Sequence, residues 1–137
     1  MNYQNHVLDK NEIASLGASL RAIEPKLLKQ SSQKGIERIW FQGGEPYFDI
    51  FFELNNQEIT WFQFTLRGQS LSWCIEQPIL KTGITNELNI DDVSFYAASK
   101  IVKNDRDRDQ EFVNLVKSIL QTRPEEAIFI KALVLFK

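Results

Sequence analysis

The sequence predicts an α+β fold, in which an N-terminal helix packs on a four-stranded antiparallel meander sheet and two or three C-terminal helices follow. Between residues 36 and 76, aromatic and β-branched residues form four short runs that Gly, Asn or Pro separate, a pattern typical of strands. Before and after this block, apolar residues recur every three or four positions, as in amphipathic helices. The length of 137 residues fits one domain, so we expect residues 1–137 to fold as a single unit.

The first helix is predicted to begin at Asp9, because Glu12 three residues later completes a capping-box pattern. Pro25 interrupts the helical pattern and would remove an internal hydrogen bond, so a kink, or a break before a short second helix to about residue 29, is expected. The face that should lie on the sheet carries Ile13, Leu16, Leu20, Ile23 and Leu27.

The four strands are expected at residues 36–42, 47–54, 58–66 and 70–76. Their pairing can be argued from the turns, because a slip of one residue would move every side chain to the opposite face. One choice of loop length for each of the three hairpins pairs apolar residues with apolar residues. The loops are four residues at 43–46, three residues at 55–57, and a two-residue type II′ turn at Gly68-Gln69. These loops place Phe41 opposite Phe48, Ile50 opposite Phe62, and Leu66 opposite Leu71.

One face of this sheet, the core face, is predicted to be apolar and to consist of Ile39, Phe41, Phe48, Ile50, Phe52, Phe62, Phe64, Leu66, Leu71, Trp73 and Ile75. The opposite side, called the second face, mixes rings and charges: Arg38, Trp40, Tyr47, Asp49, Phe51, Glu53, Ile59, Trp61, Gln63 and Thr65. A solvated sheet face is normally polar, so these four aromatic rings require a cover. The cover is either the C-terminal helices, whose apolar content favours that choice, or a molecule that the protein binds.

The last third of the chain begins with a predicted loop at residues 81–87. Asp91-Asp92 could start a helix over 93–102, although a strand is the competing interpretation. The alternating Asp and Arg residues at 105–109 lead into a helix, and Pro124 precedes another start, where helix is favoured over a buried strand at 127–136. The first of these two helices is marked by the apolar stripe Phe112, Leu115, Val116, Ile119 and Leu120.

Charge and composition exclude several classes of function. The net charge of −2 offers no broad cationic surface for nucleic acid. The N-terminal residues lack the pattern of a signal peptide, and the most apolar stretch, 127–136, is about half the length that spans a bilayer, so a cytoplasmic protein without membrane contact is expected. One cysteine and one histidine cannot build the usual zinc frameworks, so neither a metal nor a cofactor is expected.

No pair of residues amounts to a catalytic signature. Asp49 and Glu53 share a face, but four residues of strand separate them by about 13 Å, beyond the spacing of glycosidase carboxylates. Arg38 is a plausible salt-bridge partner of Glu53. Cys74 lies far in sequence from His6, and the hairpin explains the glycines at Gly43-Gly44. The chain is therefore expected to bind rather than to catalyse.

The run Trp40-Phe41-Gln42-Gly43-Gly44 is followed by a second group of residues: Asp49, Trp61, Gln63, Leu66, Gly68, Trp73 and Thr82-Gly83. Together they resemble a pattern found in a family of small bacterial α+β proteins of unassigned function, over about residues 36–87. The resemblance implies a shared sheet, and it carries over no activity and no catalytic residue.

The leading hypothesis is a non-catalytic module that binds a protein partner, or a second copy of itself, through the second face or the groove beside the 81–88 loop. Trp, Tyr and Arg are the residues that most often dominate protein interfaces. The candidate binding residues are Arg38, Trp40, Tyr47, Asp49, Trp61, Gln63, Arg67, Thr82, Asn86 and Glu87.

Two alternatives remain open. A small-molecule or enzymatic pocket could lie between the sheet and the C-terminal helices, with Asp49, Gln63, Arg67, Asn86 or Glu87 as polar contacts. A structural homodimer could instead form on the apolar segment 127–136.

Overall fold

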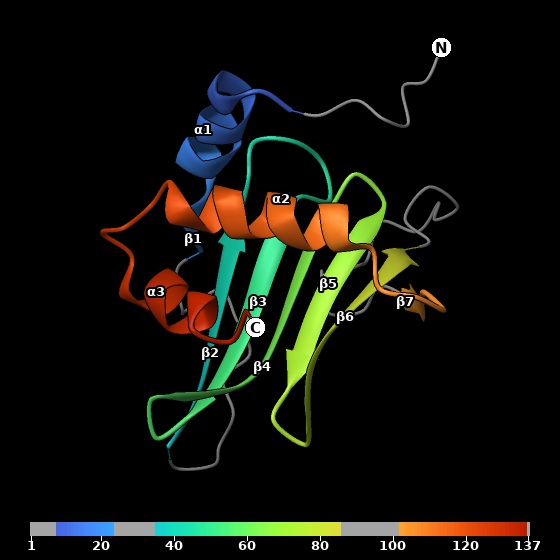
Figure 1. Ribbon diagram of the computed structural model, residues 1–137. Coiled ribbons are helices and arrows are strands. Elements are labelled where there is room, and N and C mark those ends of the chain that lie inside the picture. The colour runs from blue at the N-terminus through green and yellow to red at the C-terminus, as the bar shows by residue number, and fades with distance from the viewer. Residues whose placement is uncertain (1–7, 24–34, 86–101, 137) are drawn as a thin grey trace.

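The computed structural model describes residues 8–23, 35–85 and 102–136. Within them, three helices accompany one antiparallel sheet of seven strands, ordered β1 to β7 as in the sequence (Figure 1). The N-terminal helix, the meander and the two C-terminal helices confirm the predicted α+β class, although the sheet has more strands than the four predicted. The helices are α1 (Lys10–Ser19), α2 (Gln110–Gln121) and α3 (Ala127–Leu133), and the strands are β1 (Arg21–Ala22), β2 (Ile36–Gln42), β3 (Asp49–Asn55), β4 (Glu58–Leu66), β5 (Gln69–Cys74), β6 (Gln77–Thr85) and β7 (Val102–Asn104).

Helix α1 begins as predicted and ends earlier than predicted. The Asp9 carboxylate accepts a hydrogen bond from the Glu12 N–H at 2.8 Å, and the Glu12 carboxylate accepts one from the Asp9 N–H at 3.3 Å. Leu20 adopts an extended backbone, and β1 then pairs with β2. The predicted continuation of the helix beyond Ser19 is therefore wrong, because pairing with the sheet replaces the next helical turn. Pro25 lies outside the described residues.

The predicted loop at 81–87 is wrong over its first five residues, which continue β6 between β5 and β7. Thr82 and Gly83 read as turn residues in the sequence, but both are buried within the sheet. Of the segment predicted as helix or strand at 93–102, only Val102 is described, and it begins β7.

All three predicted hairpin registers are displaced by two residues. Side chains alternate between the two faces with a period of two, so an even displacement leaves nearly every residue on its predicted face. The observed pairs are Phe41 with Ile50, Ile50 with Phe64, and Phe64 with Leu71.

The turn between β3 and β4 has two residues and not the predicted three. Asn56 and Gln57 both have positive φ angles, 52° and 72°, as a type I′ hairpin turn requires. Pairing then shifts within β4 so that Thr60 is an extra residue, a β-bulge. The bulge turns the Ile59 side chain toward the core, where it is 7% exposed. The prediction that Ile59 lies on the second face is therefore wrong.

The turn between β4 and β5 consists of Arg67 and Gly68, whose φ angles of 53° and 83° fit type I′ and not the predicted type II′. Leu66 pairs with Gln69 across this turn. Ile75 was predicted to be core and is 52% exposed, because β5 ends one residue before it at Cys74.

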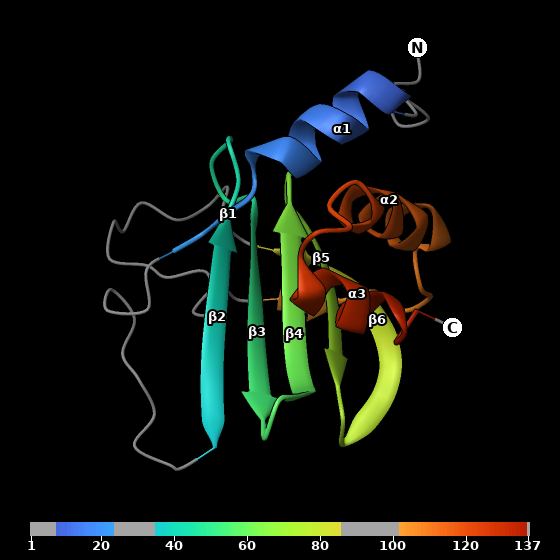
Figure 2. The same cartoon turned by 90° about the vertical axis from the view of Figure 1, so that its left-hand side faces the viewer.

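The core lies between the core face and the helices α2 and α3, which Figures 1 and 2 show on one side of the sheet. Val116, Ile119 and Phe129 have no exposed surface. The ring of Phe129 lies 4.8 Å from that of Phe41, between centroids, and Phe112 meets Phe64 at 6.2 Å. Both predicted C-terminal helices are confirmed, with helix rather than strand at 127–133.

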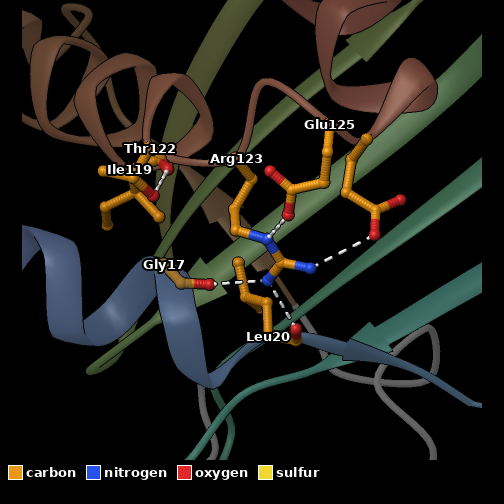
Figure 3. Close-up of polar contacts among 7 residues, drawn as sticks. Gly17, Leu20, Ile119, Thr122, Arg123 and Glu125 are labelled. Carbon is orange, nitrogen blue, oxygen red and sulfur yellow. Dashed lines mark hydrogen bonds and ion pairs between the residues drawn. The ribbon is translucent and has the colours of Figure 1, made fainter.

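Arg123, in the loop between α2 and α3, connects this loop to the end of α1 (Figure 3). One guanidinium nitrogen donates to the carbonyl oxygens of Gly17 at 2.9 Å and Leu20 at 2.7 Å. A second nitrogen bonds Glu126 at 3.1 Å, and the Nε atom pairs with Glu125. Only 17% of the Arg123 side chain is exposed. The arginine therefore supplies hydrogen bonds to carbonyl groups at the end of α1, where the helix itself provides few donors.

Gly17 permits this close approach, because a Cβ atom at this position would overlap the hydroxyl group of Thr122. Thr122 is held in place by donating to the carbonyl oxygen of Ile119 at 2.6 Å (Figure 3). The contact between α1 and α2 thus depends on the absence of a side chain at residue 17.

Replacing Arg123 with methionine should lower the free energy of unfolding by about 2–3 kcal/mol, because the partly buried carbonyls of Gly17 and Leu20 lose their charged donor and Glu126 loses its partner. Urea denaturation measures the change. The matched control is Arg106→Met at an exposed arginine, where a change within about 0.5 kcal/mol is expected. Equal effects of the two substitutions would contradict a specific role for Arg123.

Candidate functional site on the second sheet face

The second face of the sheet has no described helix against it. Figure 2 shows α2 and α3 on the opposite side and α1 beyond the end of the strands. The expectation that the C-terminal helices cover the aromatic rings of the second face is therefore wrong for α2 and α3. Their own apolar surface is used by the core face.

Arg38 and Glu53 are directly opposite each other on β2 and β3 and form the anticipated salt bridge, with 3.2 Å between nitrogen and oxygen. Their side chains are 45% and 33% exposed. A pair this exposed contributes less than about 1 kcal/mol to stability, so both groups can exchange partners at little cost.

Trp40 and Phe51 stack on each other, with ring centroids 5.3 Å apart and an angle of 10° between the rings. Phe51 is buried. The indole N–H of Trp40 is also buried and has no hydrogen-bond acceptor among the described residues. Trp40 therefore contributes to packing and presents little of its polar edge to a partner.

A row of buried residues crosses the second face from β3 to β6, in the register Asp49, Thr65, Ser70 and Gly83, of which the first three are polar. Asp49 is 6% exposed, and its carboxylate accepts a hydrogen bond of 2.7 Å from the Thr65 hydroxyl. The same hydroxyl lies 3.1 Å from the carbonyl oxygen of Tyr47. Asp49 is thus a buried polar residue, and its exposure is too small for the docking role predicted for it.

Tyr47 lies before β3, with a positive φ of 61°, and not on the predicted strand from residue 47. Such a φ angle places it in the left-handed region, within the loop that carries the chain from β2 to β3. Its side chain is half-buried.

Arg67 and Thr82, two further predicted binding residues, form hydrogen bonds within the protein. Arg67 forms two hydrogen bonds with the Glu45 carboxylate, of 2.8 and 3.0 Å, which join two turns at one end of the sheet. The Thr82 hydroxyl donates to Asp105 at 2.7 Å and accepts from the Asp109 N–H at 2.8 Å, beside the start of α2. Neither residue extends the surface around Trp61.

Asn86 and Glu87, the last two predicted binding residues, lie outside the described residues. Of the ten candidates, the structure brings Arg38, Trp40, Trp61 and Gln63 together on the second face. Trp61 and Gln63 are half-buried and stand two residues apart on β4.

A pocket that the sequence did not predict adjoins Trp61. Ser72 pairs with Lys81 and Cys74 pairs with Gln77, so residues 78–80 of β6 lie opposite a single residue of β5 and form a bulge. The pocket beside this bulge has a volume of about 140 Å³. Its lining includes Trp61, Ser72, Cys74, Gln77, Ile79, Lys81 and Asn104. It was missed because residues 81–85 of β6 were predicted as a loop and residues 77–80 were assigned to no strand, although Ile79, Thr82, Ile84 and Thr85 supply β-branched residues.

A second pocket, of about 270 Å³, lies between α1 and the loop after β2. Glu45 and Arg67, which line it, bond to each other, and Ser19 accepts a hydrogen bond of 3.0 Å from the Gly44 N–H. Its polar groups are thus engaged in holding the loops.

The space between the sheet and α2 and α3, predicted as an alternative ligand site, is filled by the apolar core. Phe52, Phe64 and Phe129 there have no exposed surface. Among residues 8–23, 35–85 and 102–136, no group of three or more acidic, cysteine or histidine residues could hold a metal ion. The helices of these segments include none that is long and apolar enough to cross a membrane.

No protein-family model, curated protein or solved structure matches this chain. The resemblance over residues 36–87 therefore stays a prediction, and the function has to be argued from the geometry.

The Glu45 and Arg67 pair should make stability depend on pH. Its two hydrogen bonds to Arg67 hold the pKa of Glu45 below its usual value. The stabilisation is therefore present above the unfolded-state pKa of about 4.3 and is lost as the pH falls through the folded-state pKa. Because both side chains are partly exposed, it amounts to less than about 1 kcal/mol.

Urea denaturation between pH 6 and pH 3 tests this for the wild type, Glu45→Gln and Arg67→Gln. The stability difference between the wild type and each variant should shrink as the pH falls. Parallel curves at all pH values would show that the pair has no pH-dependent contribution.

Trp40→Phe should change the free energy of unfolding by less than about 1 kcal/mol, because the ring stack with Phe51 persists and a buried N–H without an acceptor disappears. Trp40→Ala should cost about 3 kcal/mol through loss of the stack and of buried area. Thermal and urea unfolding of both variants measure these changes. A large loss in Trp40→Phe would mean that the indole makes an essential contact.

Proposed function

We propose that the protein is a non-catalytic binding module that docks a protein partner on the second face. The observation that carries this proposal is the position of α2 and α3, which cover the core face alone and leave a half-exposed Trp61 on the opposite side. A large aromatic residue on a sheet face without a described helix is a typical anchor for an interface.

The surroundings of Trp61 support docking. Glu53 and Cys74 are its cross-strand neighbours, and Gln63 and Ser72 pair in the next row. The apolar ring of Trp61 is therefore surrounded by polar side chains. These side chains can replace their hydrogen bonds to water with hydrogen bonds to a partner. Interfaces commonly have an aromatic centre and a polar rim.

The carboxylates near this surface support binding more than catalysis. Glu53 is paired with Arg38, and Asp49 bonds the Thr65 hydroxyl. Cys74 has as its described polar neighbour the Glu76 carboxylate, at 3.9 Å from the sulfur. A nucleophile also needs a base within hydrogen-bond reach, and the described part of the chain places no histidine or lysine in that position for Cys74.

Self-association through α3 is the second candidate. Ile130 and Val134, one turn apart on the outer side of this helix and its end, are 44% and 63% exposed. The remaining apolar residues of α3 are committed to the core, including Ile128, Phe129 and Ala132. This candidate surface is therefore narrow compared with the second face.

Trp61→Ser should reduce the capture of a partner from a lysate of the source organism by about tenfold or more, because an anchor residue at an interface commonly contributes at least about 2 kcal/mol. Arg38→Glu should reduce it less. Quantitative mass spectrometry of material retained by the immobilised full-length protein provides the measurement.

The matched control is Lys117→Glu on the exposed side of α2, which should retain the same partner as the wild type. Unchanged urea midpoints in all variants exclude unfolding as the cause. Retention of the same proteins by Trp61→Ser and the wild type would contradict docking on the second face.

A further inference from the structure

We propose that the pocket beside the β6 bulge receives the carboxylate of an acidic side chain from the docked protein partner, with Lys81 as the cationic contact. This inference rests on the proposed function and specifies the chemistry of the partner. It follows from the donors in the pocket, the pairing of the charges around it, and its size.

Among the described residues, the donors of the pocket make one hydrogen bond, from Lys81 to Gln77. The Lys81 ammonium group donates to the side-chain carbonyl oxygen of Gln77 and contacts no carboxylate of the described residues. The Gln77 amide nitrogen, the Ser72 hydroxyl and the Asn104 amide likewise have no hydrogen-bond partner there. Four donor groups thus line one pocket, and a carboxylate is the side chain that accepts several hydrogen bonds and donates none.

Two other cations of the second face and its adjoining turns differ from Lys81 in this respect. Arg38 is paired with Glu53, and Arg67 is paired with Glu45. The Lys81 ammonium group therefore lines a pocket and has no carboxylate partner among the described residues.

The walls of the pocket suit the apolar part of an acidic side chain. Trp61 supplies an aromatic surface, and Ile79, 54% exposed, lies on the bulge. A volume of about 140 Å³ admits one side chain and is well below the roughly 300–1,000 Å³ of pockets that enclose a small-molecule ligand. An anchor side chain that is continuous with a larger docked surface fits these dimensions.

Glu76 is the charged group that opposes this assignment. It follows β5, and its carboxylate lies 3.9 Å from the sulfur of Cys74, which lines the pocket. Its negative charge should weaken the attraction of a second carboxylate. Removal of this charge therefore has an effect opposite in sign to removal of the charge on Lys81.

The test is a titration of the full-length, ¹⁵N-labelled protein with acetylated tetraglutamate amide at low ionic strength, followed by two-dimensional NMR. Tetraglutamine of the same length is the control probe. We expect saturable shifts of the Trp61 indole N–H and of the Gln77 and Asn104 amide groups with tetraglutamate only. Added salt should weaken the binding, because the contact is between charges in a partly exposed site.

Three variants test which residues of the pocket determine carboxylate binding. Lys81→Gln should weaken tetraglutamate binding about fivefold or more, and Lys81→Arg should retain most of the affinity because the positive charge remains. Glu76→Gln should strengthen binding. Equal shifts with tetraglutamine, unchanged affinity in Lys81→Gln, or saturable shifts confined to another part of the molecule would each overturn the proposal.

The two proposals can fail separately. If tetraglutamate does not bind while partner capture still depends on Trp61, the carboxylate anchor is overturned and the docking surface stands. If free glutarate binds at least as tightly as the peptide and no partner depends on Trp61, the pocket takes a small carboxylate, which overturns the assignment of a protein partner.

Discussion

Apolar side chains of the core face pack against α2 and α3, and this contact determines where the rest of the molecule can act. Phe129 illustrates it, because its ring meets Phe41 and Phe52 while no part of its surface is exposed. Burial of large apolar residues is the dominant favourable contribution to folding. Because both C-terminal helices pack on the core face, neither of them covers the second face.

The second face divides into a structural part and an available part. The structural part includes the Trp40 and Phe51 stack and the hydrogen bond between Asp49 and Thr65. The available part surrounds Trp61 and continues across β5 to the pocket beside β6. In the first part, Asp49 and Thr65 are buried and bond each other, whereas the second part has exposed donor groups. Residue type alone does not separate the two parts, because both contain tryptophan and hydroxyl side chains.

Irregular positions determine the geometry of the candidate site more than the regular strands do. The bulge at residues 78–80 opens the pocket. The bulge at Thr60 allows Ile59 to face the core while Trp61, two residues later, lies on the second face. Each extra residue changes which side chains share a face. Arg123 has a comparable role for the helices, because it joins the end of α1 to the loop between α2 and α3.

The sequence by itself determined the features that depend on neighbouring residues. These were the capping box at Asp9, the amphipathic helix after Asp109, and the alternation that separates the core face from the second face. Tertiary structure decided the pairing partners, which lie two residues from the predicted ones, because several even registers satisfy the same alternation. It also decided that α1 ends at Ser19 and that residues 81–85 form a strand, since both results depend on pairing with distant strands. The pocket beside Lys81 followed from that pairing, and local sequence patterns therefore could not reveal it.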